Sequence, residues 1–101
     1  MSTMATEIDP AGFEPRAILQ AVDFRGADVL EVGAGDGRLS FRYAEAVRSV
    51  VGIDPKESEI RRASQTACAE GRGQARFLCA SGLHLPFSAE AFGIVLLGSS
   101  L

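Results

Sequence analysis

The chain has 101 residues, a formal net charge of -3 at pH 7 and a hydrophobic content of 47%. This length fits one domain, and a chain of this size buries enough surface to form a core without disulfides or metals. The acidic balance excludes the broad basic surface that general nucleic-acid binding requires.

Helices and strands are predicted to alternate along the chain. Residues 1–12 are small and polar and are expected to be flexible, whereas residues 13–101 form the domain. A short helix is expected over residues 14–23, because Pro15 suits a first helical turn and apolar residues follow on one face. The apolar run within residues 27–33 then predicts a strand that is buried on both faces.

The rest of the chain continues this alternation. Apolar spacing predicts a helix over residues 38–47, followed by a β-branched strand over 49–54 and a second amphipathic helix over 55–71. Residues 75–80 and 92–101 predict two more strands, with a loop between them. Strands that alternate with helices favour right-handed crossovers and a parallel α/β sheet.

A glycine-rich stretch, VLEVGAGDGRLS, places Gly33, Gly35 and Gly37 between the first of these strands and the helix that follows. In a parallel α/β sheet, such a turn is where a nucleotide lies against the backbone and a helix N-terminus. Asp54 ends the next strand, 21 positions after Gly33, the separation at which a carboxylate reaches ribose hydroxyls. Two plainer interpretations stay open: the glycines make only a tight turn, and Asp54 only caps a helix.

The spacing of the glycines distinguishes between classes of nucleotide-binding protein. The dinucleotide fingerprint G-x-G-x-x-G/A requires glycine or alanine at position 38, where this chain has Arg38. A P-loop requires Gly-Lys-Ser or Gly-Lys-Thr, which the sequence lacks. A dehydrogenase and a nucleoside triphosphatase are therefore both disfavoured.

At three motifs the chain resembles the class I S-adenosylmethionine-dependent methyltransferases that act on small molecules. These motifs are EVGAGDG at residues 31–37, VGIDP at 51–55 and LHLPFSAEAFGIVLLGSSL at 83–101, which is similar to the family's LPF and F-D-x-V region. The resemblance covers about residues 14–101. It implies a Rossmann-like parallel sheet of about four strands in the order 3-2-1-4 with three helices, which is the N-terminal, cofactor-binding half of that fold.

The resemblance also implies a site for S-adenosylmethionine. Glu31 would face the methionine amino group, the three glycines would lie under the methionine and ribose, and Asp54 would hold the ribose hydroxyls. Ser81 stands where the family often has an aspartate that accepts a hydrogen bond from adenine, and either Ile53 or Pro55 would pack against that base. The implied cofactor-binding residues are Glu31, Gly33, Gly35, Gly37, Asp54, Ser81 and Gly82; no metal site is implied.

Glu31 also raises a physical question of its own. An acidic side chain within an apolar strand is costly to bury without a partner, so a charged or donating group should meet it. The ammonium group of a ligand would suffice. Besides Ser81, one more position departs from the family pattern. Gly93 stands where the family has the aspartate of F-D-x-V.

The function that the resemblance implies is methyl transfer from S-adenosylmethionine to a small-molecule acceptor, with catalytic residues unknown. His84 is a candidate base, although a loop histidine is more often a solvated side chain. Ser99 and Ser100 lie where an acceptor would come but are equally typical of an ordinary loop. The chain ends where the family's fourth strand ends, and the part that follows normally supplies much of the acceptor pocket. A non-catalytic binding or assembly module therefore remains an alternative, and a nicotinamide-binding half domain is a less favoured one because of Arg38.

The fourth predicted strand has an apolar edge, which invites pairing with another chain. We therefore expect a homo-oligomer, or a partner chain bound at this strand. The N-terminus lacks the basic and apolar blocks of a secretory signal, and no apolar run is long enough to span a membrane. Cys68 and Cys79 lack metal-ligand spacing, so we expect a reducing, cytoplasmic location.

Overall fold

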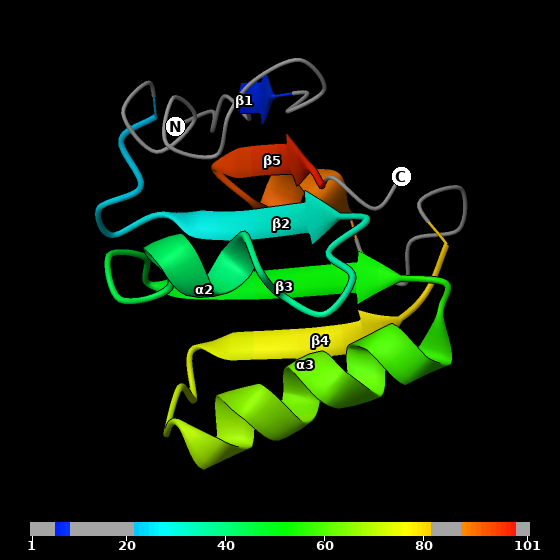
Figure 1. Cartoon of the computed structure of the whole chain (residues 1–101). Coiled ribbons are helices and arrows are strands. Elements are labelled where there is room, and N and C mark those ends of the chain that lie inside the picture. Colours follow the sequence, from blue (N-terminus) through cyan, green and yellow to red (C-terminus); the bar gives the residue numbers. More distant parts are fainter. Residues whose placement is uncertain (1–5, 9–21, 82–87, 99–101) are drawn as a thin grey trace.

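The computed structural model describes residues 6–8, 22–81 and 88–98 of the chain. Within these residues, five parallel strands form one sheet in the order β1-β5-β2-β3-β4 (Figure 1). The strands are β1 (Thr6–Ile8), β2 (Asp28–Val32), β3 (Ser49–Asp54), β4 (Ala75–Cys79) and β5 (Ile94–Leu97). Strands β4, β3, β2 and β5 lie side by side in this order and are the third, second, first and fourth strands that the sequence predicts. This confirms the expected order 3-2-1-4 and the Rossmann-like α/β class.

Two α-helices, rather than the three expected, connect the strands in the described part of the chain. They are α2 (Ser40–Tyr43) and α3 (Glu57–Ala69), and a 3-10 turn, η1 (Ala89–Ala91), precedes β5. The helix expected over residues 14–23 lies mostly outside the described residues, and Val22 and Asp23 are not helical. No helix among the residues that are described is long and apolar enough to cross a membrane.

Helix α2 is a single turn, shorter than the helix predicted over residues 38–47. Its continuation is replaced by hydrogen bonds to the loop that precedes β2. The Gly26 N–H donates to the Ala46 carbonyl at 2.8 Å, and the Arg48 N–H donates to the Ala27 carbonyl at 2.8 Å. These long-range bonds draw the chain away from the helix axis and lead it directly into β3.

The sheet is apolar on both faces, as its β-branched strands predict. Helices α2 and α3 lie on the same face (Figure 1), where Val29, Val50 and Phe77 pack in the main core cluster. On the opposite face, Leu30 and Ile53 pack with Phe92, which follows η1. Packing on both faces holds the strands in place. Side chains at the carboxyl ends of the strands therefore have fixed positions.

The outer side of β5 is not an edge in this structure. Strand β1 pairs with it in parallel, through Thr6↔Ile94, Glu7↔Val95 and Ile8↔Leu96. The edges of the described sheet are therefore β1 and β4, which corrects the expectation of an exposed fourth strand. Three residues are too short a run for alternation to be recognised, so the sequence did not reveal β1 among residues expected to be flexible.

Gly52 provides a test of how closely β3 and its neighbours pack. A Cβ atom at this position would lie 2.7 Å from Phe77 Cδ1 and 2.8 Å from Ala34 Cβ. We expect Gly52→Ala to lower the free energy of unfolding by about 1–3 kcal/mol in urea denaturation, as overpacking of a core does. Gly73→Ala adds a carbon that meets nothing within 4 Å, so this control should stay within about 0.5 kcal/mol of wild type. Equal effects at the two positions would contradict the packing described.

Candidate functional site

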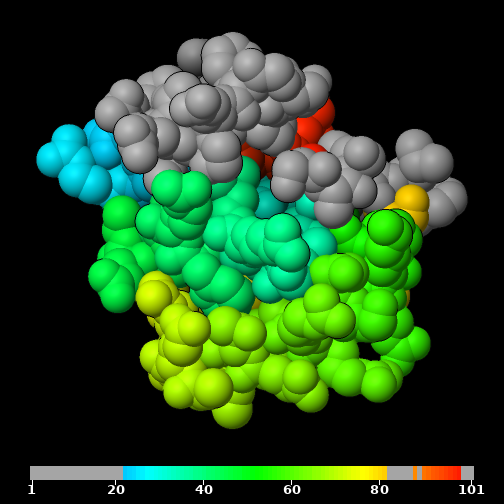
Figure 2. All heavy atoms as spheres, viewed as in Figure 1, coloured from blue at the N-terminus to red at the C-terminus, as the bar shows by residue number. Residues whose placement is uncertain are grey.

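The glycine turn, residues 33–37, follows β2 at the carboxyl edge of the sheet. In Figure 2 the atoms of this segment that can be seen are turquoise and lie next to α3 in green, but apart from the half-buried Asp36 its residues are buried. Its three glycines have φ angles of 80°, 59° and 88°, values that side chains strongly disfavour. The conformation of the turn alone therefore requires glycine at all three positions, so their number is not by itself a sign of a ligand.

The backbone of the turn is held mainly by β3. The N–H groups of Gly33 and Ala34 both donate to the Ile53 carbonyl, at 2.8 and 2.9 Å, and the Gly37 N–H donates to the Ala34 carbonyl at 3.1 Å. These amides are therefore not the unpaired donors that a phosphate-binding turn presents. The turn is a rigid wall of a site rather than a cradle for an anion.

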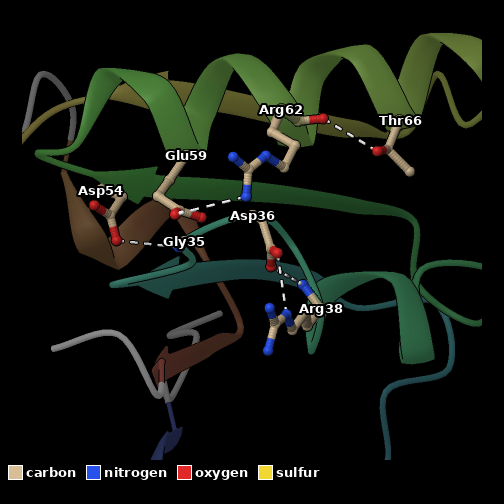
Figure 3. A network of polar contacts seen from close by, with 7 residues as sticks. All are labelled: Gly35, Asp36, Arg38, Asp54, Glu59, Arg62 and Thr66. Atoms are coloured by element: carbon tan, nitrogen blue, oxygen red, sulfur yellow. Dashed lines mark hydrogen bonds and ion pairs between the residues drawn. The ribbon is translucent and has the colours of Figure 1, made fainter.

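Asp54, at the end of β3, joins the glycine turn to the start of α3 (Figure 3). Only 2% of this residue is exposed. Its Oδ2 atom accepts a hydrogen bond from the Gly35 N–H at 3.0 Å, and its Oδ1 atom accepts one from the Lys56 N–H at 2.9 Å. The bond to Lys56 is a turn just before the helix rather than the capping that the sequence left open, because Lys56 itself is the N-cap residue of α3 and no side chain caps it. The bond to Gly35 is a second role, because it fixes the turn itself.

Glu31, near the end of β2, is also buried, with 1% of its surface exposed. Its Oε1 atom accepts hydrogen bonds from Ser40 Oγ at 2.9 Å and from Tyr43 Oη at 2.6 Å. Burial raises the pKa of Glu31 to about 7, although the two hydroxyl groups act to lower it. At neutral pH this carboxyl group is therefore divided between its charged and neutral forms.

Sequence reasoning required a donor for Glu31 but assigned that part to a ligand and missed Ser40 and Tyr43. Both hydroxyl groups come from α2, where residues three positions apart share one face. Burial raises the pKa of Tyr43 well above its usual value, and the charge of Glu31 raises it further, so its hydroxyl group remains a donor. The sequence does contain a signal for them. Two hydroxyl residues three positions apart follow an acid in an apolar strand, on the side of the next helix that faces the core.

Gly98, just after β5, is a second residue that the sequence did not single out. Its N–H donates to the Val32 carbonyl at 2.5 Å, which brings the end of β5 against the glycine turn. A side chain here would overlap the carbonyl group of Gly33 and approach Glu31 Oε2 to 3.1 Å. The absence of a side chain at position 98 therefore keeps the second oxygen of Glu31 uncovered on this side.

The other predicted site residues divide between two edges of the sheet. Ser81 is partly buried and follows β4, whose Cys79 is in register with Asp54, so it lies at the same edge as the glycine turn. Gly93 lies at the opposite edge, where its N–H donates to the Asp28 carbonyl at 3.0 Å. The missing aspartate at position 93 is therefore remote from the turn.

Burial decides between the two residues proposed to pack on adenine, whereas several other predicted site residues lie outside the described part of the chain. Ile53 is fully buried, so of the two candidates for packing on adenine only the exposed Pro55 is accessible. Gly82, His84 and the serines at 99 and 100 lie outside the described residues. Within the residues described, no group of three histidine, cysteine or acidic side chains could hold a metal ion.

An open cavity of about 580 Å³ lies away from this site, between the last turns of α3 and β4. Cys68, Arg72 and Phe77 are among its lining residues. It adjoins the amino end of β4, whereas Asp54 and the glycine turn lie at the carboxyl ends of the strands. The chemistry of the two carboxylates is therefore not directed into this cavity.

Comparison with known proteins decides what kind of site this is. A family model described as a methyltransferase domain matches residues 29–101. The chain belongs to this methyltransferase family. The match confirms the resemblance to the class I methyltransferases, and it includes Glu31, the glycine turn and Asp54.

The methyltransferase-family chain is also similar to individual proteins. It is similar to nocamycin O-methyltransferase from Saccharothrix syringae, with 37% identity over 84 residues, 79% of this chain and 30% of that protein. The crystal structure of Bacillus subtilis YcgJ shares the fold, with a TM-score of 0.79 and 24% identity over 85% of this chain and 37% of that one.

A third relative was solved with ligands bound. It is phosphoethanolamine N-methyltransferase 1 from Haemonchus contortus, in complex with phosphoethanolamine and S-adenosylhomocysteine. Its TM-score is 0.74 and its identity 25%, over 82% of this chain and 18% of that one. The methyltransferase-family chain thus spans less than two fifths of the length of each of these relatives.

The raised pKa of Glu31 predicts a pH dependence of stability. The folded state holds this proton more tightly than the unfolded state, where the pKa is near 4.5. Its contribution to stability is therefore fully present below about pH 4.5 and is lost as the pH rises through about 7. From this group we expect the free energy of unfolding to fall by about 3 kcal/mol over that range in urea denaturation.

Glu31→Gln should remove this part of the decline while keeping the shape of the side chain. Asp28→Asn is the matched control, because hydrogen bonds from Ser49 and Arg48 lower the pKa of Asp28, so its own contribution lies at more acid pH. The control should show the same decline as wild type. A Glu31→Gln protein that loses stability with pH as steeply as wild type would contradict a buried, protonated Glu31.

Proposed function

We propose that this chain binds S-adenosylmethionine at the edge formed by the glycine turn, Glu31 and Asp54, and serves the transfer of the cofactor's methyl group to a small-molecule acceptor. The observation that carries the proposal is the pair of carboxylates, 1% and 2% exposed, that flank the turn on adjacent strands of a methyltransferase-family chain. Glu31 would meet the cationic amino group of the cofactor. Asp54 would accept hydrogen bonds from the ribose hydroxyls.

The charge of the site supports this cofactor over phosphate-bearing nucleotides. A dinucleotide or a nucleoside triphosphate brings negative charge, which Glu31 and Asp54 would repel. The N–H groups of Gly33, Ala34 and Gly35 are bonded within the protein, so they do not form an anion-binding nest. A nucleoside with a cationic tail is the chemical class that fits two buried carboxylates.

When bound, S-adenosylmethionine supplies a methyl group carried on a sulfonium. In this chemistry the described residues would bind and orient the cofactor. Holding reactants in place can supply much of the rate acceleration. Glu31 and Asp54 would fix its two polar ends along the rigid turn. A binding module without turnover stays the second candidate.

Isothermal titration calorimetry of the chain with S-adenosylmethionine, S-adenosylhomocysteine and NAD tests the proposal. We expect heat of binding with the first two ligands and none with NAD. Asp54→Ala should weaken binding by about 1.5–3 kcal/mol, because hydrogen bonds to a charged group are lost. Binding without methyl transfer to any acceptor in a panel of small hydroxyl and amine compounds would support the module.

The controls separate binding from folding. Asp54 also holds Gly35 and Lys56, so the Tm of the variant must be measured beside its affinity. Asp28→Asn removes a carboxylate at the opposite edge of the sheet and should leave affinity unchanged. The absence of heat with all three ligands contradicts the cofactor, whereas a lower Tm with unchanged affinity contradicts the ribose role of Asp54.

We also propose that the chain associates with a second copy through the outer side of β5, where a strand of the partner replaces β1. The support is the shortness of β1, which pairs with only three residues of β5 and could be replaced by a longer strand. Separately, we propose a cytoplasmic location. The free, exposed thiols of Cys68 and Cys79 support it, because such thiols persist in a reducing compartment. Light scattering at high protein concentration should show a dimer, and a monodisperse monomer would contradict it.

A further inference from the structure

The two oxygens of Glu31 have different surroundings. Both hydroxyl groups of α2, from Ser40 and Tyr43, donate to Oε1. The Oε2 atom lies instead on the side of the glycine turn, where a Cβ on Gly98 would come within 3.1 Å of it. One oxygen is therefore committed to the protein, and the other faces the proposed cofactor site.

The donors to Oε1 are held rigidly by the core. Ser40 is fully buried and Tyr43 is 3% exposed. The Tyr43 ring stacks on Phe24, with ring centroids 4.4 Å apart and an angle of 6° between the planes. Packing thus fixes the direction of the hydroxyl group, which donates to Glu31 Oε1 at 2.6 Å.

We propose that Tyr43 and Ser40 are positioning residues that hold Glu31 through one oxygen and present the other to the cationic amino group of S-adenosylmethionine, and that binding releases the proton which Glu31 holds in the free protein. This inference rests on the proposed function. It goes further because it assigns roles to two residues of α2 and makes binding dependent on pH. The proton leaves to solvent as the ligand's ammonium group takes its place beside the carboxylate.

Within residues 6–8, 22–81 and 88–98, no cationic side chain is paired with Glu31. The pKa of Glu31 reflects burial first and then the hydroxyl groups of Tyr43 and Ser40, without a contribution from any positive charge. The neighbouring strands place Gly52 and Leu96 in register with Glu31. A ligand ammonium is therefore the cation that stabilises the charged form and lowers the pKa.

Two other charged residues among those described at this edge, Arg38 and Asp54, have partners within the protein. In the turn, Arg38 Nε pairs with Asp36 Oδ2 at 3.0 Å, and the Arg38 side chain is 87% exposed (Figure 3). Asp54 accepts the amides of Gly35 and Lys56.

Calorimetry with S-adenosylmethionine at pH 6.0, 7.0 and 8.5, in buffers with different enthalpies of ionisation, tests the inference. Wild-type affinity should rise about fivefold from pH 6.0 to pH 7.0, and the heat at pH 7.0 should depend on the buffer because about half a proton is released. Tyr43→Phe removes a hydrogen bond that favours the carboxylate. It should weaken binding about fivefold at pH 7.0 but less than about twofold at pH 8.5.

Variants are compared at the same pH, so titration of the ligand's own amino group affects them equally. Tyr43→Phe keeps the ring that stacks on Phe24, and Ser40→Ala should shift the profile in the same direction. Ser49→Ala is the matched control, because it removes a 2.7 Å hydroxyl bond to a carboxylate, Asp28, at the other end of β2. It should bind like wild type at each pH.

The outcomes separate this inference from the proposed function. No binding by the wild-type chain overturns the proposed function, and the inference with it. Binding by wild type that is weakened equally at every pH in Tyr43→Phe and Ser40→Ala assigns them a merely structural role and overturns the inference alone. Heat that does not depend on the buffer at pH 7.0 overturns the proton release.

Discussion

The burial of Glu31 is the constraint on which the candidate site depends. A carboxyl group in an apolar strand must be neutral, hydrogen-bonded or paired, and here it is raised in pKa and bonded to two hydroxyl groups of α2. These bonds fix α2 over β2 and thereby determine where the glycine turn can run. The same burial makes the group costly to charge, so a cation that reaches it gains a strong partner.

Asp54 repeats this arrangement on the next strand by a different route. It is equally buried, but backbone amides rather than hydroxyl groups meet its oxygens, and they belong to the glycine turn and to the start of α3. Asp54 therefore holds the turn through Gly35, while the amides of Gly33 and Ala34 bond to β3. In the function we propose, negative charge against this backbone favours a cationic nucleoside over phosphates.

Much of the fold follows from local pattern, and the differences have tertiary causes. Strand β3 begins and ends where the sequence predicted, because a β-branched run between polar residues has few alternatives. Helix α2 is shorter than predicted because Ala46 bonds to Gly26, 20 residues earlier in the chain. The position of Glu31 and Asp54 beside the turn was predictable from spacing. The donors to Glu31 were not, since they depend on how α2 packs against β2.

The most direct measurement of the central claim is the titration of the Glu31 carboxyl group itself. Carbon NMR of protein labelled at the glutamate side-chain carboxyl groups, assigned with Glu31→Gln, reports its protonation with and without S-adenosylmethionine. We predict a pKa near 7 for the free protein, as burial dictates, and a clear downward shift when the cofactor is present. An ordinary glutamate pKa in the free protein, or a raised one that S-adenosylmethionine leaves unchanged, would contradict the account.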